Sequence, residues 1–129
     1  MKEVIRTDAA PAPFQGAPYS QAVKANGFVF VSGQLALHPG ETGLVEAGIA
    51  EQTEQVLANL RAILEEAGTS LENLVKTTVF LQDLSDFGGM NEVYARHVGD
   101  RPPSRSTVEV AKLPSGALVE IDAIAALPT

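Results

Sequence analysis

The chain has 129 residues, of which 45% are apolar and 19% charged, values typical of a folded domain and unlike those of a disordered chain. Sixteen acidic residues against nine lysines and arginines give a net charge of −7, so the overall field disfavours nucleic acid as a partner. The absence of cysteine excludes disulfides, a thiol nucleophile and a thiolate metal site, and no apolar run is long enough to cross a membrane.

No internal repeat, low-complexity tract or long linker divides the chain, so we expect a single domain over residues 1–129. The N-terminal residues Met1 to Arg6 lack the long apolar core of a signal peptide. We therefore expect a cytoplasmic protein with no membrane association.

Prolines make the segment from Ala9 to Pro18 irregular, because each lacks an amide donor and restricts the residue before it. Two β-prone stretches follow, Ser20–Ala25 and Phe28–Ser32, and they flank Asn26-Gly27, a pair that favours a tight hairpin turn. The second stretch begins with four apolar residues, which predicts an interior strand that helices cover on at least one side.

Apolar residues recur with the period of an amphipathic helix from Gly48 to Ala67, and Gly68 supplies a C-terminal stop. The next stretch, Leu74–Leu81, is rich in valine and threonine. It predicts a strand whose odd-numbered residues, beginning with Val75, share one face.

A second helix is predicted after this strand, with Asp83 or Ser85 as its cap. Its apolar stripe consists of Phe87, Met90, Tyr94 and Val98. Pro102-Pro103 then breaks the chain, and Arg105–Leu113 and Ala117–Ala126 predict two strands joined by a turn.

This order of strands and helices predicts an α+β domain in which two helices pack on one face of a mixed sheet. The apolar positions on the opposite face would have to be buried by another copy of the chain. We therefore expect an oligomer.

Few residues offer catalytic chemistry. The two histidines, His38 and His97, are far apart in sequence and neither belongs to a metal-binding motif, so we expect no metal site. Ser32 is not part of the Gly-x-Ser-x-Gly elbow of serine hydrolases. A pair of charged residues near the C-terminus remains, Arg105 and Glu120.

These two charges allow two interpretations. In the simpler one, Glu120 and Asp122 lie on the solvated face of an edge strand, and Arg105 caps a loop. In the other, both charges serve one site. If the chain reverses near Ser115, Glu120 lies level with about Val110, roughly 15 Å along the strand direction from Arg105. A site that used both would then lie between subunits.

Further blocks of sequence follow one another along nearly the whole chain. They are APYSQ at 17–21, VSGQ at 31–34, EQTEQVLANL at 51–60, VKTTVFL at 75–81, DF at 86–87 with NEVY at 91–94, PSRSTVEVAKLP at 103–114 and VEIDAIA at 119–125. In these blocks the sequence resembles the reactive-intermediate deaminase family, also called YjgF/YER057c/UK114.

The resemblance implies a chorismate-mutase-like α+β fold and a homotrimer with clefts between neighbouring subunits. It also implies hydrolysis of 2-aminoacrylate, or its imine tautomer 2-iminopropionate, to pyruvate and ammonia without a cofactor. The corresponding imine from threonine would give 2-oxobutyrate.

The resemblance also implies roles for individual residues. Arg105 would bind the substrate carboxylate through two parallel hydrogen bonds, and Glu120 would act as general base on a water molecule. The positions expected to contact substrate are Tyr19, Ser32, Gly33, Asn91, Arg105 and Thr107. Position 107 is commonly cysteine in the best-known members, so Thr107 is a departure from the family pattern.

Two alternatives to the enzyme remain. A non-catalytic trimer could bind small ketoacids or a partner protein through the same cleft without turnover. RNA cleavage, reported for some relatives, is disfavoured by the acidic balance of the chain.

Overall fold

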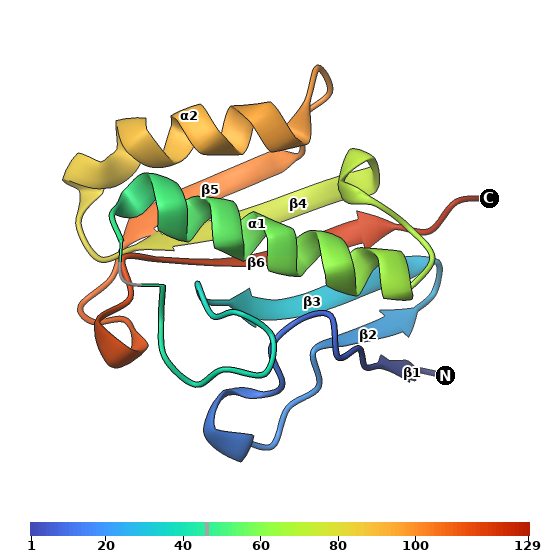
Figure 1. Cartoon of the computed structure of the whole chain (residues 1–129). Coiled ribbons are helices and arrows are strands. Elements are labelled where there is room, and N and C mark those ends of the chain that lie inside the picture. Colours follow the sequence, from blue (N-terminus) through green and yellow to red (C-terminus); the bar gives the residue numbers. More distant parts are fainter. Residues whose placement is uncertain (46) are drawn as a thin grey trace.

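A six-stranded mixed sheet forms the frame of the protein in a computed structural model, which describes residues 1–45 and 47–129 (Figure 1). In chain order the strands are β1 (Glu3–Ile5), β2 (Ala22–Ala25), β3 (Phe28–Gln34), β4 (Leu74–Leu81), β5 (Ser104–Glu109) and β6 (Val119–Ala126). Their order across the sheet is β1-β2-β3-β6-β4-β5. Neighbouring strands are antiparallel except β4 and β5, which are parallel.

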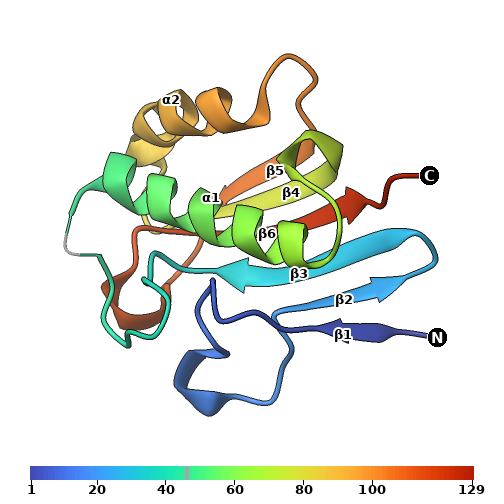
Figure 2. The same cartoon turned by 45° about the vertical axis from the view of Figure 1, so that its right-hand side comes forward.

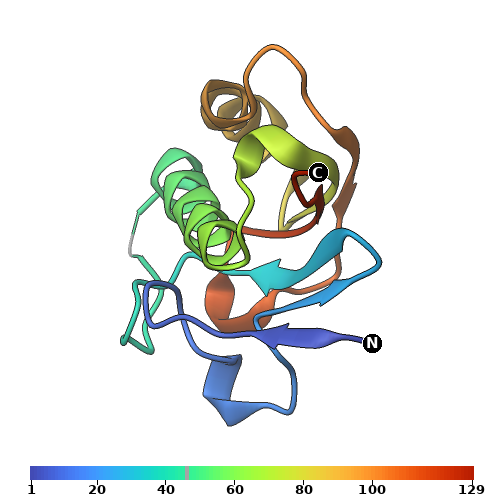
Figure 3. The same cartoon turned by 90° about the vertical axis from the view of Figure 1, so that its right-hand side faces the viewer.

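Two α-helices, α1 (Ile49–Glu66) and α2 (Phe87–Val98), pack side by side on the same face of this sheet (Figures 1 and 3). Most of the apolar residues of α1 are fully buried and meet the inward residues of the central strands in one core, namely Val56, Leu57, Leu60, Ile63 and Leu64. The α+β prediction with both helices on one face is therefore confirmed. None of the helices in the described part of the chain is long and apolar enough to cross a membrane.

The predicted hairpin is confirmed. Asn26 and Gly27 both have positive φ angles, 51° and 83°, as a tight turn between β2 and β3 requires. Along β3, Val29 and Val31 are buried beneath the helices, whereas Phe28 and Phe30 on the other face are about 40% exposed. The strand is interior, as predicted, but helices cover only one of its faces.

A β-bulge corrects the prediction for β4. The register between β4 and β6 shifts between Leu74 and Lys76. Leu74 is consequently buried, and Val75, which the alternation placed on the same face as Thr77, is 43% exposed. From Thr77 onwards the odd-numbered residues face the core, as predicted.

The last two predicted strands are shorter than expected and are not neighbours, because β4 lies between β5 and β6. The last hydrogen bond between β5 and β4 runs from the Val110 amide to the Leu81 carbonyl. The pairing stops there because β4 ends at Leu81. Leu113, predicted to end the strand, instead donates its amide to the Gln82 side chain at 2.8 Å.

The start of α2 also differs from expectation. Asp83 accepts a hydrogen bond from the Ser85 amide at 2.8 Å and so caps the 3-10 turn Leu84–Asp86, which leads into the helix. Gly89 allows α2 to approach α1, because a Cβ there would lie only 2.7 Å from Ile49 Cγ2. Close packing therefore accounts for a glycine that weakens helix propensity.

Candidate functional site

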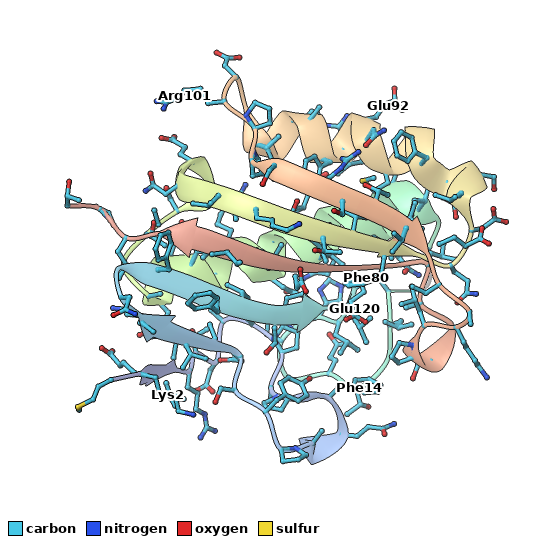
Figure 4. The ribbon with its side chains drawn as sticks, turned by 180° about the vertical axis from the view of Figure 1, so that it is seen from behind. Lys2, Phe14, Phe80, Glu92, Arg101 and Glu120 are labelled. Carbon is cyan, nitrogen blue, oxygen red and sulfur yellow. The ribbon has the colours of Figure 1, made fainter. Side chains whose placement is uncertain are left out.

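A cavity of about 540 Å³ opens at the C-terminal end of β3, next to the beginning of β6. The segment between β1 and β2 extends beyond the sheet at this end and supplies one wall (Figure 2). Four of the predicted site residues line the cavity, namely Tyr19, Ser32, Gly33 and Glu120. Figure 4 shows Glu120 and Phe80 near one another on the face that the helices leave open, with Phe14 close by on the N-terminal segment.

Two buried amide side chains hold the irregular walls of the cavity. Gln21 donates to the carbonyls of Thr7 and Pro11 at 3.0 and 2.8 Å, and accepts from the Thr7 amide at 2.7 Å. Asn59 of α1 donates to the carbonyls of Leu35 and Leu37 at 3.1 and 2.9 Å. These bonds satisfy backbone groups that lie outside the sheet ladder, and so tie the loops to the rest of the fold.

The carboxyl group of Glu120 lies directly against the backbone of Gly33. A Cβ at position 33 would lie 2.9 Å from Glu120 Cδ and closer still to Oε2, so glycine leaves the room that the carboxyl occupies. Burial raises the pKa of the Glu120 carboxyl above its ordinary value, and the negative charge of Asp122 raises it further. The group is therefore easier to protonate than a solvated glutamate.

The edge-strand interpretation of Glu120 is wrong, because β6 lies in the interior of the sheet between β3 and β4. Strand alternation nevertheless places Glu120 and Asp122 on the face opposite the helices, where both are partly exposed. The Glu120 carboxylate is therefore half-buried at the cavity wall and not fully solvated, as the edge-strand interpretation required.

Two hydroxyl groups of the cavity have defined hydrogen-bonding states. Ser32 Oγ donates to the Ser20 carbonyl at 2.7 Å, so its lone pairs stay available to accept. Tyr19 accepts from the Phe14 amide at 2.5 Å, which leaves the phenolic proton available to donate. One hydroxyl can therefore accept from a ligand and the other can donate to it.

The other predicted site residues form a second group, on β5 and α2. The Arg105 guanidinium lies 5.5 Å from the Phe87 ring centroid and 4.9 Å from that of Tyr94. Asn91 is half-buried and lies between these two aromatic positions on one face of α2. Thr107 lies two residues beyond Arg105, and its hydroxyl oxygen is buried with no hydrogen-bond partner in the described part of the chain.

The sheet register separates the two groups within one chain. Phe80 pairs with Glu120 on one side and with Val108 on the other, so Glu120 is level with Val108 rather than Val110. Arg105 lies three residues further along β5, roughly 10 Å, and two strand spacings away, roughly another 10 Å. The two side chains also point to opposite faces of the sheet, Arg105 towards α2 and Glu120 away from the helices.

Some residues of these two groups were not predicted as site residues. Phe14 belongs to the irregular proline-rich segment, where no period predicts its position. Phe87 and Tyr94 were expected only as core residues of a helix, but Phe87 is 42% exposed and both rings contact Arg105. Gln21, Phe87 and Tyr94 do belong to blocks that resemble the family. The four contacts of Gln21 with the segment 7–11 explain why a glutamine fits there.

Comparison with known sequences gives matches over almost the whole chain. The family model described as endoribonuclease L-PSP matches residues 7–127. A RutC family protein of Pyrococcus horikoshii is 51% identical over 97% of this chain and 98% of its own length. The mouse protein 2-iminobutanoate/2-iminopropanoate deaminase is 45% identical over 97% of this chain and 91% of its own length.

Solved structures agree with the sequence matches. Yeast Mmf1 has a TM-score of 0.94 and 42% identity, covering 99% of this chain and 100% of that one. Escherichia coli TdcF, crystallised with bound serine, has a TM-score of 0.89 and 38% identity, covering 98% and 99% of the two chains. The chain belongs to the reactive-intermediate deaminase family.

Proposed function

We propose that this protein hydrolyses short-lived 2-imino acids and their enamine tautomers, such as 2-aminoacrylate and 2-iminopropionate, to 2-ketoacids and ammonia. The observation that carries the proposal is the half-buried Glu120 carboxyl, held against Gly33 in a cavity of about 540 Å³. Family membership and 45% identity to a mouse protein named for this activity support it. The serine bound to Escherichia coli TdcF supports a ligand of amino-acid size.

Arg105 provides the carboxylate-binding group. Its planar guanidinium donates two parallel hydrogen bonds to the substrate carboxylate and so fixes the neighbouring imine carbon. Because β5 is an edge strand, Arg105 lies at the margin of the sheet, where a second copy of the chain can approach. In this proposal the cavity of one subunit is completed by Arg105, Thr107 and Asn91 from a neighbouring subunit.

Glu120 activates water. The carboxylate accepts a proton as the water oxygen bonds to the imine carbon, and the C=N double bond becomes a C–N single bond. Starting from the protonated imine, Glu120 then returns this proton to the amine nitrogen. The C–N bond breaks to release ammonia, and Glu120 accepts the remaining hydroxyl proton as the C=O bond forms. A raised pKa suits both steps, because a group that titrates nearer neutrality can accept the proton and release it.

Tyr19 and Ser32 complete the polar part of the cavity. The free phenolic proton of Tyr19 can donate to the substrate, and the lone pairs of Ser32 can accept from the water or the imine nitrogen. The apolar wall contributed by residues such as Phe14 and Leu35 limits competing water.

The experiment that tests the function is an ammonia-release assay. A pyridoxal-phosphate dehydratase generates the imine from serine or threonine in the presence and absence of this protein. We expect ammonia release to be faster than spontaneous decay in buffer. Ketoacid binding without acceleration would instead support the non-catalytic trimer.

Gly33→Ala tests the close approach between the backbone and Glu120. The added methyl group would displace the carboxyl, and we expect kcat/KM for imine hydrolysis to fall on the order of tenfold. Gly43→Ala is the matched control, because a Cβ there meets no atom within 4 Å and the backbone is not in the left-handed region. Equal activity of the two variants would show that Glu120 needs no such placement.

We further propose that the functional assembly is a homotrimer. The sheet face without helices carries a row of apolar side chains that the single chain leaves partly exposed. They include Val4, Phe28, Phe30, Phe80, Val108 and Ile124. If this face is buried against other copies, Arg105 of one subunit can lie next to the cavity of its neighbour.

Light scattering should therefore report a mass close to three chains of 13.6 kDa. Phe30→Asp places a charge opposite Ile124 on this face and is expected to shift the protein towards smaller species with loss of activity. A stable and active monomer at micromolar concentration would contradict both the trimer and a shared site.

A further inference from the structure

We infer that Phe87 and Tyr94 are positioning residues, which hold the Arg105 guanidinium in the orientation that binds the substrate carboxylate. This inference rests on the proposed function. The guanidinium carbon lies 5.5 Å from the Phe87 ring centroid and 4.9 Å from the Tyr94 ring centroid. Both distances are within the range over which an aromatic face attracts a cation.

A hydrogen bond to β4 fixes the position of the Tyr94 side chain. Its hydroxyl forms a buried 2.6 Å hydrogen bond with Thr77 Oγ1. Thr77 is the direct partner of Arg105 in the parallel β4–β5 ladder, so both residues point towards α2 from adjacent strands. Tyr94 therefore spans the two strands, with its hydroxyl fixed on one and its ring face against the cation of the other.

The guanidinium also interacts with the Tyr94 hydroxyl, but its other contacts leave N–H donors available. Arg105 Nη1 approaches the Met90 sulfur at 4.0 Å, a weak interaction. Within residues 1–45 and 47–129, no carboxylate lies within 4.0 Å of Arg105. Aromatic rings attract a guanidinium without forming an ion pair with it, so the charge stays available for the carboxylate of a ligand.

Phe87 provides the sharper test, because it has little packing to lose. The ring is 42% exposed, whereas Tyr94 is 5% exposed and belongs to the core. Phe87→Leu removes the aromatic face but keeps an apolar side chain at the beginning of α2. Phe87→Tyr keeps the face and serves as the conservative variant.

The experiment measures binding of pyruvate and of its neutral amide, pyruvamide, to the full-length protein by titration calorimetry. We expect Phe87→Leu to weaken pyruvate binding about threefold and to leave pyruvamide binding unchanged. In turnover, KM should rise by a similar factor with little change in kcat. Phe87→Tyr should behave as the parent protein. Leu84→Ala, on an exposed apolar side chain in the turn before α2, should also behave as the parent.

The outcomes separate this inference from the function on which it rests. If Arg105→Lys weakens pyruvate binding but Phe87→Leu does not, the positioning role is wrong and the carboxylate site stands. If Phe87→Leu weakens pyruvate and pyruvamide equally, the ring contacts the ligand itself and the inference also fails. If pyruvate binding does not depend on Arg105, the carboxylate site and the positioning role are both wrong.

Discussion

Arg105→Ala is expected to lower kcat/KM for imine hydrolysis by roughly 10²- to 10³-fold while leaving the assembly intact. The reason is the loss of two charge-assisted hydrogen bonds to the substrate carboxylate, each stronger than a neutral bond. Assembly should survive because Arg105 lies on an edge strand and, in the described part of the chain, forms no ion pair. Ammonia release under constant imine supply gives the rate, and light scattering gives the mass.

Three further variants sharpen this prediction. Arg105→Lys keeps the charge but not the planar two-point donor, so we expect most of the activity to be lost. Arg101→Ala, on an exposed arginine before β5, should have no effect. Thr107→Val should retain most activity, because water addition to an electrophilic imine needs no protein nucleophile and the lost hydroxyl has no partner among the described residues.

Loss of activity in Thr107→Val equal to that in Arg105→Ala, with both assemblies intact, would overturn the water-based mechanism. The Thr107 hydroxyl would then be a catalytic group. Near-normal kinetics in Arg105→Ala would instead show that another residue holds the carboxylate.

Glu120→Gln is expected to slow ammonia release by about 10²- to 10⁴-fold, the usual contribution of a general base. The amide has nearly the same shape as the carboxyl and fits the same space against Gly33, so folding should be preserved. A parental rate of ketoacid formation would require Glu120 to be reassigned to packing or binding.

The pH dependence of the parent protein follows from the same carboxyl group. Burial and Asp122 raise the pKa of Glu120, and the ionised form is the one that accepts the proton from water. The value of kcat/KM should therefore fall as pH falls through this raised pKa, at a higher pH than an ordinary glutamate would give.

Asp122→Asn is the matched control for this pH dependence. It removes the neighbouring negative charge, so the pKa of Glu120 should fall and the acid limb of kcat/KM should move to lower pH. Glu120→Gln should abolish that limb. A limb that persists unchanged in Glu120→Gln would mean that another group titrates in this range.

The residues of the site were predicted from sequence more completely than their arrangement. A carboxylate at position 120 among apolar neighbours and an arginine at position 105 are visible in the chain itself. Their separation was also predicted, from a chain reversal near Ser115 that placed Glu120 level with about Val110. In the structure Glu120 is level with Val108, and β4 lies between β5 and β6. This arrangement could not be predicted, because the parallel β4–β5 ladder pairs residues far apart in the chain and leaves no local signal.

The sequence by itself determined the local elements. The 3.6-residue period determined α1, Asn26-Gly27 determined the first hairpin, and alternation determined most of β4, because each depends on residues close together in the chain. Only the tertiary structure decided that β6 is interior, that Gly33 makes room for Glu120, and that Phe87 and Tyr94 contact Arg105. These features join residues far apart in sequence, and the free energy that selects such contacts comes from packing and burial, which leave no period in the chain.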